Sequence, residues 1–245
     1  MIANSAADFS NHTCTAPAER SDRMRDIVVA HVPQRRAGRI LDLGCGTGSL
    51  VMRLADAFPD ASLTGIDISA ANIRAARDQA AAVGRANRIR FENGDYLAYT
   101  TEPFDAIVAD GVLHLIPGDT DRLLKKIAGD LRDGGVFVCS MPFDCLYNRI
   151  FAIVRRSLRM IRSAPVDRLI IGAARLVHRG GMDDAAMRER VQYMYLPPIR
   201  VMGEHLASQF AAAGLSRTAE APMPSTSPSQ LKHSVTIWTR RGTGG

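Results

Sequence analysis

Short apolar runs alternate along the chain with longer segments in which apolar residues recur every three or four positions. The runs predict buried β-strands, and the longer segments predict amphipathic helices. The predicted strands lie at residues 40–43, 62–66, 89–96, 104–109 and 136–141, and the range 89–96 includes the residues that leave the strand. The predicted helices lie at residues 19–32, 51–58, 70–83 and 121–131. Such alternation is typical of an α/β fold with a doubly wound, mostly parallel sheet.

The first predicted strand runs into the glycine-rich turn Asp42-Leu43-Gly44-Cys45-Gly46-Thr47-Gly48. Its glycines let the backbone turn sharply and let a ligand approach the main chain, and we expect amides at the start of the next helix to face that ligand. Ser49 occupies the third glycine position of a dinucleotide-binding G-x-G-x-x-G, and the Lys of a P-loop is missing after Gly48. The turn therefore fits neither phosphate motif, and Asp42, which would repel phosphate, suits a cationic amine.

This turn resembles motif I of the class I S-adenosylmethionine-dependent methyltransferases, in which the loop wraps the methionine half of the cofactor. The resemblance covers the chain in four stretches, at residues 20–142, 203–214, 216–220 and 234–240. It implies a Rossmann-like sheet of seven strands with the last strand antiparallel. S-adenosylmethionine is the implied cofactor and S-adenosylhomocysteine its product. The loop residues that the resemblance assigns to the cofactor are Asp42, Gly44, Cys45, Gly46 and Gly48.

Acidic residues also follow the next two predicted strands. Asp67, followed by Ile68, lies about 20 residues beyond the glycine turn, where nucleotide-binding folds place a carboxylate on the ribose hydroxyls. The resemblance implies that Gly94 and Asp95 contact the adenine and that Tyr96 lies beside it. Gly-Asp is also an ordinary turn dipeptide, so a structural role for this pair stays open.

The fourth predicted strand ends on Asp110-Gly111, and Val112-Leu113-His114 follows. Ligands of open parallel sheets bind at the carboxyl ends of the strands, beside the switch point. We therefore expect Asp110, Gly111 and His114 near the transferred methyl group. His114 is a candidate general base because its unperturbed pKa lies near neutrality, and a packing or capping role is the alternative.

Residues 143–202 do not belong to the minimal fold. The first part, residues 146–162, is predicted to be a helix with one apolar face and one face of solvated arginines, Arg155 among them. Two further helices are predicted at residues 166–178 and 183–194. We interpret the insertion as a lid over the site. Contact of residues 146–162 with an anionic membrane and a homodimer interface are the alternatives.

Motifs of several methyl-acceptor classes are missing. Asp110-Gly111-Val112-Leu113 replaces the Asn/Asp-Pro-Pro-aromatic segment of DNA amino-methylating enzymes, and Pro142 is not followed by the cysteine of cytosine-C5 enzymes. Ser140-Met141 replaces the Asp-Asn pair of metal-dependent enzymes, and the two glutamates of protein arginine enzymes are absent. Metal-independent transfer to an O, N or C nucleophile of a small, secondary-metabolite-like molecule remains. The candidate acceptor contacts are His114, Tyr147 and Tyr195. If the acceptor needs a base, His114 is the first candidate, and the lower-ranked candidates in the insertion are Tyr147, Tyr193, Tyr195 and His178. A lipid acceptor and a non-catalytic binding module are the alternatives.

Composition changes this interpretation little. The chain has 245 residues and a net charge of +6, which permits an acidic partner without requiring one. Its basic segment lacks the interleaved aromatics of a single-strand binder, so no nucleic acid is expected. The four cysteines form no C-x-x-C pair, and no signal peptide or run of about 18 apolar residues is found, which favours the cytoplasm. We expect a mobile arm at 1–18, a cofactor-binding core at 19–142 and 203–241, and the lid at 143–202.

Overall fold

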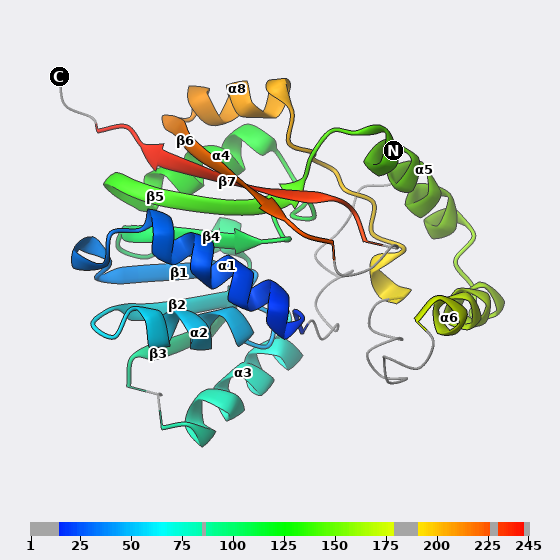
Figure 1. The fold of residues 1–245 in the computed structure, drawn as a ribbon, viewed down its shortest axis with the longest axis horizontal. Helices are drawn as coiled ribbons and strands as arrows, with labels where there is room; N and C mark the ends of the chain where they lie inside the picture. Colours follow the sequence, from blue (N-terminus) through cyan, green and yellow to red (C-terminus); the bar gives the residue numbers. More distant parts are fainter. Residues whose placement is uncertain (1–14, 85–86, 179–190, 226–229, 243–245) are drawn as a thin grey trace.

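The computed structural model describes residues 15–84, 87–178, 191–225 and 230–242. The strands are β1 Arg39–Leu43, β2 Ser62–Asp67, β3 Ile89–Asn93, β4 Phe104–Asp110, β5 Leu131–Pro142, β6 Leu215–Met223 and β7 His233–Arg240 (Figure 1). The helices are α1 Ala18–His31, α2 Ser49–Ala57, α3 Ala70–Ala82, α4 Thr120–Gly129, α5 Leu146–Met160, α6 Ala164–His178 and α8 Glu204–Ala212, with short 3-10 turns η2 Gln34–Arg36 and η3 Tyr96–Ala98.

The strands form one seven-stranded sheet in the order β3-β2-β1-β4-β5-β7-β6. The first five strands pair in parallel, and β7 is antiparallel to both β5 and β6. The predicted Rossmann-like fold, with its antiparallel last strand, is confirmed. The chain reverses its direction of winding between β1 and β4, and the carboxyl ends of these two strands form the switch point at which such sheets bind ligands.

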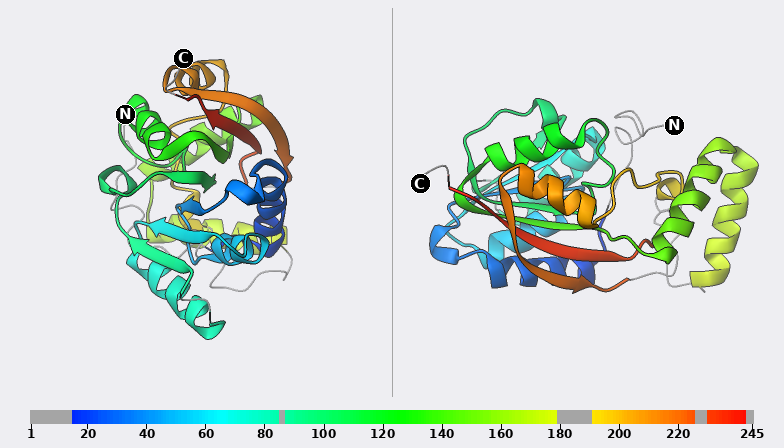
Figure 2. Two further views of the ribbon diagram at one scale, coloured as in Figure 1. Left: turned by 90° about the vertical axis from the view of Figure 1, so that its left-hand side faces the viewer. Right: turned by 90° about the horizontal axis from the view of Figure 1, so that it is seen from above.

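Apolar clusters fill both faces of the sheet. One cluster joins the sheet to α1, α2 and α3 and contains Met24, Leu54 and Ile73. The other joins it to α4 and α8 and contains Leu124 and Phe210. Figures 1 and 2 show α5 and α6 beyond the end of the sheet, outside both layers. The core is therefore complete without α5 and α6.

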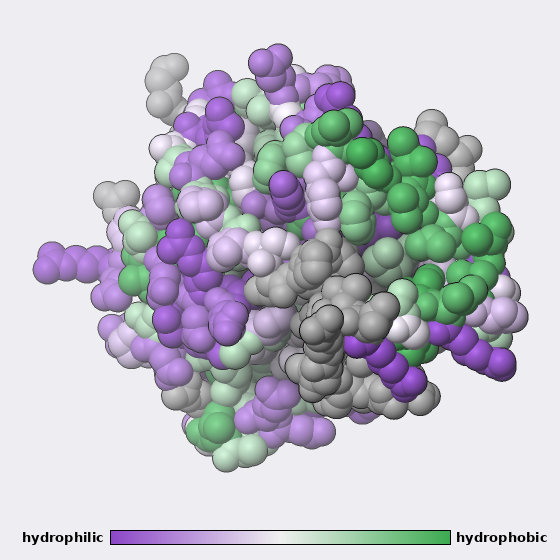
Figure 3. Space-filling model, turned by 45° about the vertical axis from the view of Figure 1, so that its right-hand side comes forward, coloured by the Kyte–Doolittle hydropathy of each residue, from purple (hydrophilic) through white to green (hydrophobic). Residues whose placement is uncertain are grey.

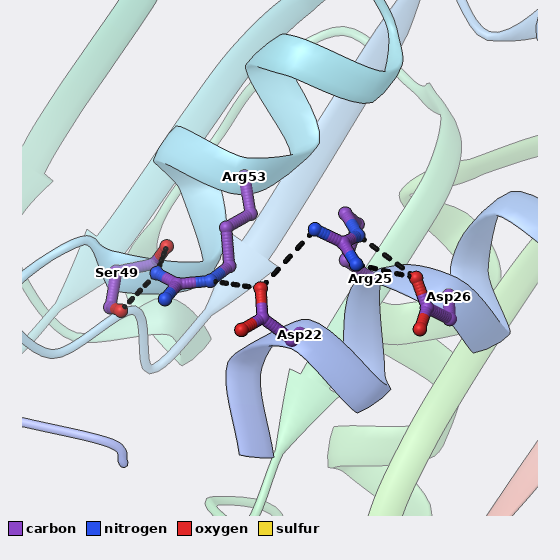
Figure 4. Close-up of polar contacts among 5 residues, drawn as sticks. All are labelled: Asp22, Arg25, Asp26, Ser49 and Arg53. Atoms are coloured by element: carbon purple, nitrogen blue, oxygen red, sulfur yellow. Dashed lines mark hydrogen bonds and ion pairs between the residues drawn. The ribbon is translucent and has the colours of Figure 1, made fainter. Parts of the chain in front are cut away.

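Polar contacts fasten α1 to α2, the helix that follows the glycine turn (Figure 4). Arg53 of α2 donates from Nε to Asp22 of α1 at 2.7 Å and from Nη1 to the Ser49 hydroxyl at 2.8 Å. Arg25 donates to the same Asp22 oxygen at 3.2 Å. These contacts hold the N-terminal helix beside the start of α2, and thus beside the turn itself.

The fifth strand differs from its prediction. β5 begins at Leu131, where the sequence predicts the end of a helix, and includes the predicted turn at 132–135. Leu131 pairs with Phe104 and Val136 with Ala106, so five steps along β5 oppose two along β4. The Asp-Gly-Gly segment forms a bulge within the strand because Gly134 adopts a positive φ of 74°.

The orientation of α5 also differs. Asn148 and Arg155 are its buried residues, whereas apolar side chains of the predicted inner face, such as Ile150 and Val154, are exposed. The prediction that Arg155 belongs to a solvated face is wrong. The side of α5 that packs on the protein therefore lies between the two predicted faces: Arg156 is exposed, whereas Phe151 is half-buried.

Two predictions fall on residues outside the described part of the chain: most of the arm at 1–18 and most of the helix at 183–194. The division into core and lid stays a prediction. Among the helices that the structure describes, none has both the length and the apolar character needed to span a bilayer.

Candidate active site

The glycine turn packs tightly against neighbouring side chains at two positions. Gly44 has a φ of +74°, and a Cβ placed on it would lie 2.5 Å from the side chain of Val112. Gly48 has a φ of +83°, and a Cβ there would lie 2.8 Å from the ring of Phe91. Both the positive φ and the missing space exclude a larger residue. The turn is therefore held against the loop after β4 and against β3.

Amides of the turn are bonded within the protein. Gly44 and Cys45 both donate to the Ile66 carbonyl, at 2.8 and 3.1 Å, and Gly46 donates to Asp67 Oδ2 at 2.9 Å. Asp67 Oδ1 accepts from the Ser69 amide at 2.8 Å. Asp67 thus links the turn to the start of α3, and its position is fixed before any ligand binds.

A cavity of ≈ 190 Å³ opens at the carboxyl ends of β1, β2 and β4. Eight of the predicted cofactor residues line it: Gly44, Asp67, Ile68, Gly94, Asp95, Tyr96, Asp110 and Gly111. Four do not: Asp42, Cys45, Gly46 and Gly48. An apolar wall completes the cavity; it is formed by Leu43, Ile66, Leu97, Val112, Leu115, Ile116 and Pro117. The family resemblance implies that the segment 112–116 borders the cofactor, whereas the other wall residues and Asn72 were not predicted. The apolar run after Asp110 was the available signal for part of that wall.

Asp42 lies behind the turn and is only 3% exposed. Burial raises the pKa of its carboxyl well above the ordinary value, and the nearby Asp110 and Asp67 raise it further. The same burial, with Asp42 and Asp67, raises the pKa of the Cys45 thiol. Three acidic side chains from three adjacent strand ends thus lie close together, and a positively charged ligand beside them would favour the ionised form of Asp42.

Asp110 has a partner that the sequence did not reveal. Arg20 of α1 donates to both its oxygens, at 2.9 Å from Nε to Oδ2 and 2.6 Å from Nη2 to Oδ1. Arg20 also donates to the Ser140 hydroxyl at 2.9 Å and to His233 Nδ1 at 3.2 Å. One arginine thereby joins α1 to the tips of β4, β5 and β7. Residues 90 positions apart carry no local signal of such a pair.

A second unpredicted arginine fixes the loop after β4. Arg200 donates from Nε to the Thr120 hydroxyl at 2.8 Å and from Nη2 to the Gly118 carbonyl at 2.7 Å. It also donates to the carbonyls of Leu113 and Ile116. Because this loop forms part of the apolar wall, Arg200 helps to set the shape of the cavity.

Two of the residues predicted to lie at the adenine, Asp95 and Tyr96, are held in place by contacts within the protein. Asp95 Oδ1 accepts from the Leu97 amide at 2.9 Å and caps η3. The Tyr96 hydroxyl donates to Asp130 at 2.8 Å, and the Lys126 ammonium lies 4.8 Å from the centre of its ring. The Tyr96 ring therefore borders the cavity, while its hydroxyl is engaged elsewhere.

His114 is buried, with 4% exposure, and does not line this cavity. Burial lowers the pKa of His114 to about 3, and the guanidinium groups of Arg155, Arg20 and Arg200 contribute. Its ring meets that of His233 edge-on at 5.3 Å. Among the described residues its Nδ1 has no hydrogen-bond partner. A neutral imidazole with a low pKa is a weak base for an alcohol or amine.

The tyrosines of the insertion differ in position. Tyr193 lines the cavity, and its role as a candidate base stays a prediction. Tyr147 stacks on Phe151 at 4.6 Å and donates to the Gln230 carbonyl at 3.3 Å. Tyr195 is buried, and its hydroxyl donates to Asp167 of α6. Neither Tyr147 nor Tyr195 lines the cavity, and their roles toward an acceptor stay predictions.

The fold and this strand-end cavity define a Rossmann-like nucleotide-binding protein. Comparison with known proteins is more specific, because residues 41–137 match a family model described as "Methyltransferase domain". That segment is less than half of the chain and carries the glycine turn and the strand-end acids, and it is similar to the domain of class I S-adenosylmethionine-dependent methyltransferases.

Relatives of known name are similar over part of the chain. A trans-aconitate 2-methyltransferase of Deinococcus radiodurans is 37% identical over 123 residues, which cover 50% of this chain and 45% of that protein. Another, of Streptomyces avermitilis, is 33% identical over 137 residues, covering 54% and 51%. A carboxy-S-adenosyl-L-methionine synthase of Nitratiruptor is 37% identical over 119 residues, covering 48% of each. The aligned segments span about half the length of these curated relatives.

Solved structures share the fold over nearly the whole chain. Magnesium protoporphyrin IX methyltransferase of Synechocystis, solved with bound S-adenosylhomocysteine, has a TM-score of 0.60 at 18% identity and covers 91% of this chain and 83% of its own. The [4+2]-cyclase SpnF has a TM-score of 0.62 at 19% identity and covers 98% and 87%. At these identities the likeness shows the fold alone.

The residues present fit the cofactor that the family implies. S-adenosylmethionine carries an ammonium and a sulfonium, and the buried Asp42 carboxylate is near two further acids. Its adenosine needs an apolar wall with acceptors at the rim, and the cavity combines such a wall with Asp67 and Asp95. Charge and surface chemistry therefore agree.

Proposed function

We propose that the protein is an S-adenosylmethionine-dependent methyltransferase acting on a small-molecule acceptor, at an O, N or C nucleophile. The observation that carries this proposal is the convergence of Asp42, Asp67 and Asp110 beside one cavity at the switch point of a seven-stranded sheet. The family match and the methyltransferases among its relatives support it.

Each part of the site would hold a part of the cofactor. Asp42 favours the ammonium by charge, Asp67 accepts from the ribose hydroxyls, and Asp95 accepts from the adenine amine. The sulfonium supplies an activated methyl group, so the chain has little covalent chemistry to perform. Its residues position the acceptor at the tip of β4 and exclude water with the apolar wall that Leu115 and Ile116 form.

Calorimetric titration with S-adenosylmethionine and S-adenosylhomocysteine tests this function. We expect the wild type to bind both compounds and Asp67→Ala to bind each more weakly by about 1 to 3 kcal/mol, because buried hydroxyls lose a charged acceptor. Asp67→Asn keeps the shape of the side chain and removes only its charge. Asp60→Ala, at an exposed turn acid, is the matched control and should bind as the wild type does.

Two outcomes would count against the proposal. Equal affinity of Asp67→Ala and wild type would remove Asp67 from the site. A wild type that binds neither compound would favour the non-catalytic binding module instead. The [4+2]-cyclase named above shows that a protein of this fold can carry a different activity.

A membrane-associated or lipid acceptor is the second candidate, and the surface of α5 favours it. Leu146 is 74% exposed and Ile153 63%, and Ile150 and Met160 are exposed beside them. Figure 3 shows hydrophobic side chains gathered over this side of the molecule. Helix α5 contains four arginines and no acidic residue.

That combination matches an anionic bilayer better than a second copy of the chain. Arginines beside an exposed apolar stripe face lipid phosphates favourably. A two-fold dimer through the same face would bring equal positive charges together. Location in the cytoplasm and independence from metal ions stay predictions.

A further inference from the structure

Arg155 of α5 is directed into the protein although a helix at the surface could expose it. Its side chain is 7% exposed. Nη1 donates to the Leu196 carbonyl at 3.4 Å, and Nε has no hydrogen-bond partner among the described residues. Among the described residues, no carboxylate forms an ion pair with Arg155. Arg155 is thus a buried cation with an unused donor.

A second unused group faces the same region. His114 Nδ1 is also buried without a partner among the described residues. Arg155 donates to the Leu196 carbonyl, and the Ile199 amide, three residues further along, donates to the His114 carbonyl at 2.9 Å, so both residues lie against the segment 196–199. The charge of Arg155 accordingly helps to lower the pKa of His114. Asp110, at the tip of β4, already accepts hydrogen bonds from Arg20 with both oxygens. Among the described residues, no carboxylate therefore balances the charge of Arg155.

Such an arrangement costs free energy unless a ligand completes it. Burial lowers the pKa of Arg155 only to about 10, so the side chain stays charged at neutral pH. A buried charge without a counter-ion is strongly unfavourable. The planar guanidinium fork matches a carboxylate with two parallel hydrogen bonds.

We propose that Arg155 and His114 bind a carboxylate group of the methyl acceptor, which makes the acceptor an organic acid. The proposal rests on the proposed methyltransferase function and names the chemical class of its substrate. His114 lies in the loop after β4, whose Val112 and Leu115 line the cofactor cavity. The carboxylate would therefore be held next to the methyl donor. Arg155 lies beyond residues 41–137, so the family match does not assign this role.

Neutral His114 acts here by hydrogen bonding, as donor or acceptor according to its tautomer, and Arg155 supplies the charge. In this arrangement His114 binds the acceptor and takes no proton from it. The low pKa of His114 makes the ring a weak base and keeps it neutral, so that it can still form a hydrogen bond with the carboxylate group.

Calorimetry on protein saturated with S-adenosylhomocysteine tests the proposal. The probes are a panel of mono-, di- and tricarboxylates including trans-aconitate, together with trans-aconitate trimethyl ester and inorganic phosphate. We expect at least one free acid to bind the wild type and its ester to fail. Arg155→Met, which keeps the length of the side chain and removes its charge, should weaken that binding at least tenfold, and Arg155→Lys less.

Controls separate this site from the cofactor site. Arg156→Met removes the neighbouring exposed arginine of the same helix and should bind the acid as the wild type does. All variants should retain their affinity for S-adenosylhomocysteine and their thermal unfolding temperature within a few degrees. Loss of S-adenosylhomocysteine binding in the wild type would instead count against the proposed function.

Three results would overturn the proposal. One is unchanged affinity of Arg155→Met for the acid. Another is equal binding of acid and ester. The third is failure of every carboxylate in the panel to bind the cofactor-loaded wild type, with or without binding of phosphate.

Discussion

The same residue type acquires different properties at neighbouring strand ends. Asp67 accepts three hydrogen bonds, from the Gly46 amide, the Ser69 amide and the Asn72 side chain. Asp42 is more deeply buried, and no donor to its carboxylate is found in the described part of the chain. Hydrogen bonds of the fold therefore hold Asp67, whereas burial disfavours the ionised form of Asp42.

Asp42→Asn should separate stability from binding. We expect the ligand-free variant to be more stable than the wild type at pH 7, by about 1 to 3 kcal/mol, because a neutral amide replaces a buried carboxyl whose ionised form is disfavoured. The sign follows from the raised pKa of Asp42: the unfolded chain loses this proton at a lower pH than the folded chain, so the wild type loses stability as the pH rises above the ordinary pKa of the carboxyl. Urea unfolding at pH 7 measures the difference.

The same variant should bind S-adenosylmethionine about tenfold more weakly, or worse, because the ammonium loses its opposite charge. Calorimetry provides this second measurement. A variant that is less stable than the wild type, yet binds equally well, would contradict the role given to Asp42.

Residues with a local signal were predictable, and residues that act across the chain were not. Asp67 and the glycines follow from spacing within one strand-turn-helix unit. Arg20, Arg155 and Arg200 reach their partners over 90, 41 and more than 80 positions. A lone arginine on an amphipathic helix is ordinarily solvated, so nothing in the sequence distinguishes Arg155 from Arg156.

At the scale of elements, α5 shows what periodicity leaves open. The pattern separates an apolar from a polar face, and the usual inference turns the apolar face inward. Here the core is already complete, and α5 meets the protein through Asn148 and Arg155. Asn148 donates to the carbonyls of Phe143 and Lys232 at 2.7 and 2.8 Å, which anchors α5 by hydrogen bonds.

The exposed face of α5 predicts binding to anionic vesicles. We expect the wild type to sediment with vesicles containing phosphatidylglycerol more than with pure phosphatidylcholine, and less at 0.5 M salt, where charge is screened. Ile150→Ser with Ile153→Ser should reduce the bound fraction about tenfold, because two large apolar side chains are lost.

Val83→Ser is the matched control for that experiment, since Val83 is an exposed apolar residue, 55% accessible, near the end of α3. It should bind vesicles as the wild type does. Equal sedimentation of the wild type with and without anionic lipid would exclude the charge-dependent contact.

At the scale of the whole molecule, alternation of strands and helices was sufficient for the architecture. Parallel order follows from helices between strands, and the family resemblance added the antiparallel last strand. The bulge in β5 and the contact of Arg20 in α1 with Asp110 were not predictable, because both depend on pairing between distant segments.

Global stability should fall in acid because of buried histidines. The pKa of His114 is lowered to about 3 and that of His233 is also well below its ordinary value, so between pH 6.5 and 3 the unfolded chain binds protons that the folded chain does not. His114→Gln should reduce the loss of stability by about 1.4 kcal/mol per pH unit below 6.5. Urea unfolding at pH 7, 6 and 5 measures both slopes, and parallel slopes would contradict a neutral buried His114.

The ion pair between Arg20 and Asp110 affects the affinity of the site for a positively charged ligand. A cation drawn to the tip of β4 competes with Arg20 for the same two oxygens, so occupation of that edge and attachment of the N-terminal helix are opposed equilibria. Linkage makes the two effects equal. The free energy by which attached Arg20 weakens binding of the cation is the free energy by which the bound cation weakens attachment of α1. The observed affinity is then the intrinsic attraction less the cost of loosening α1.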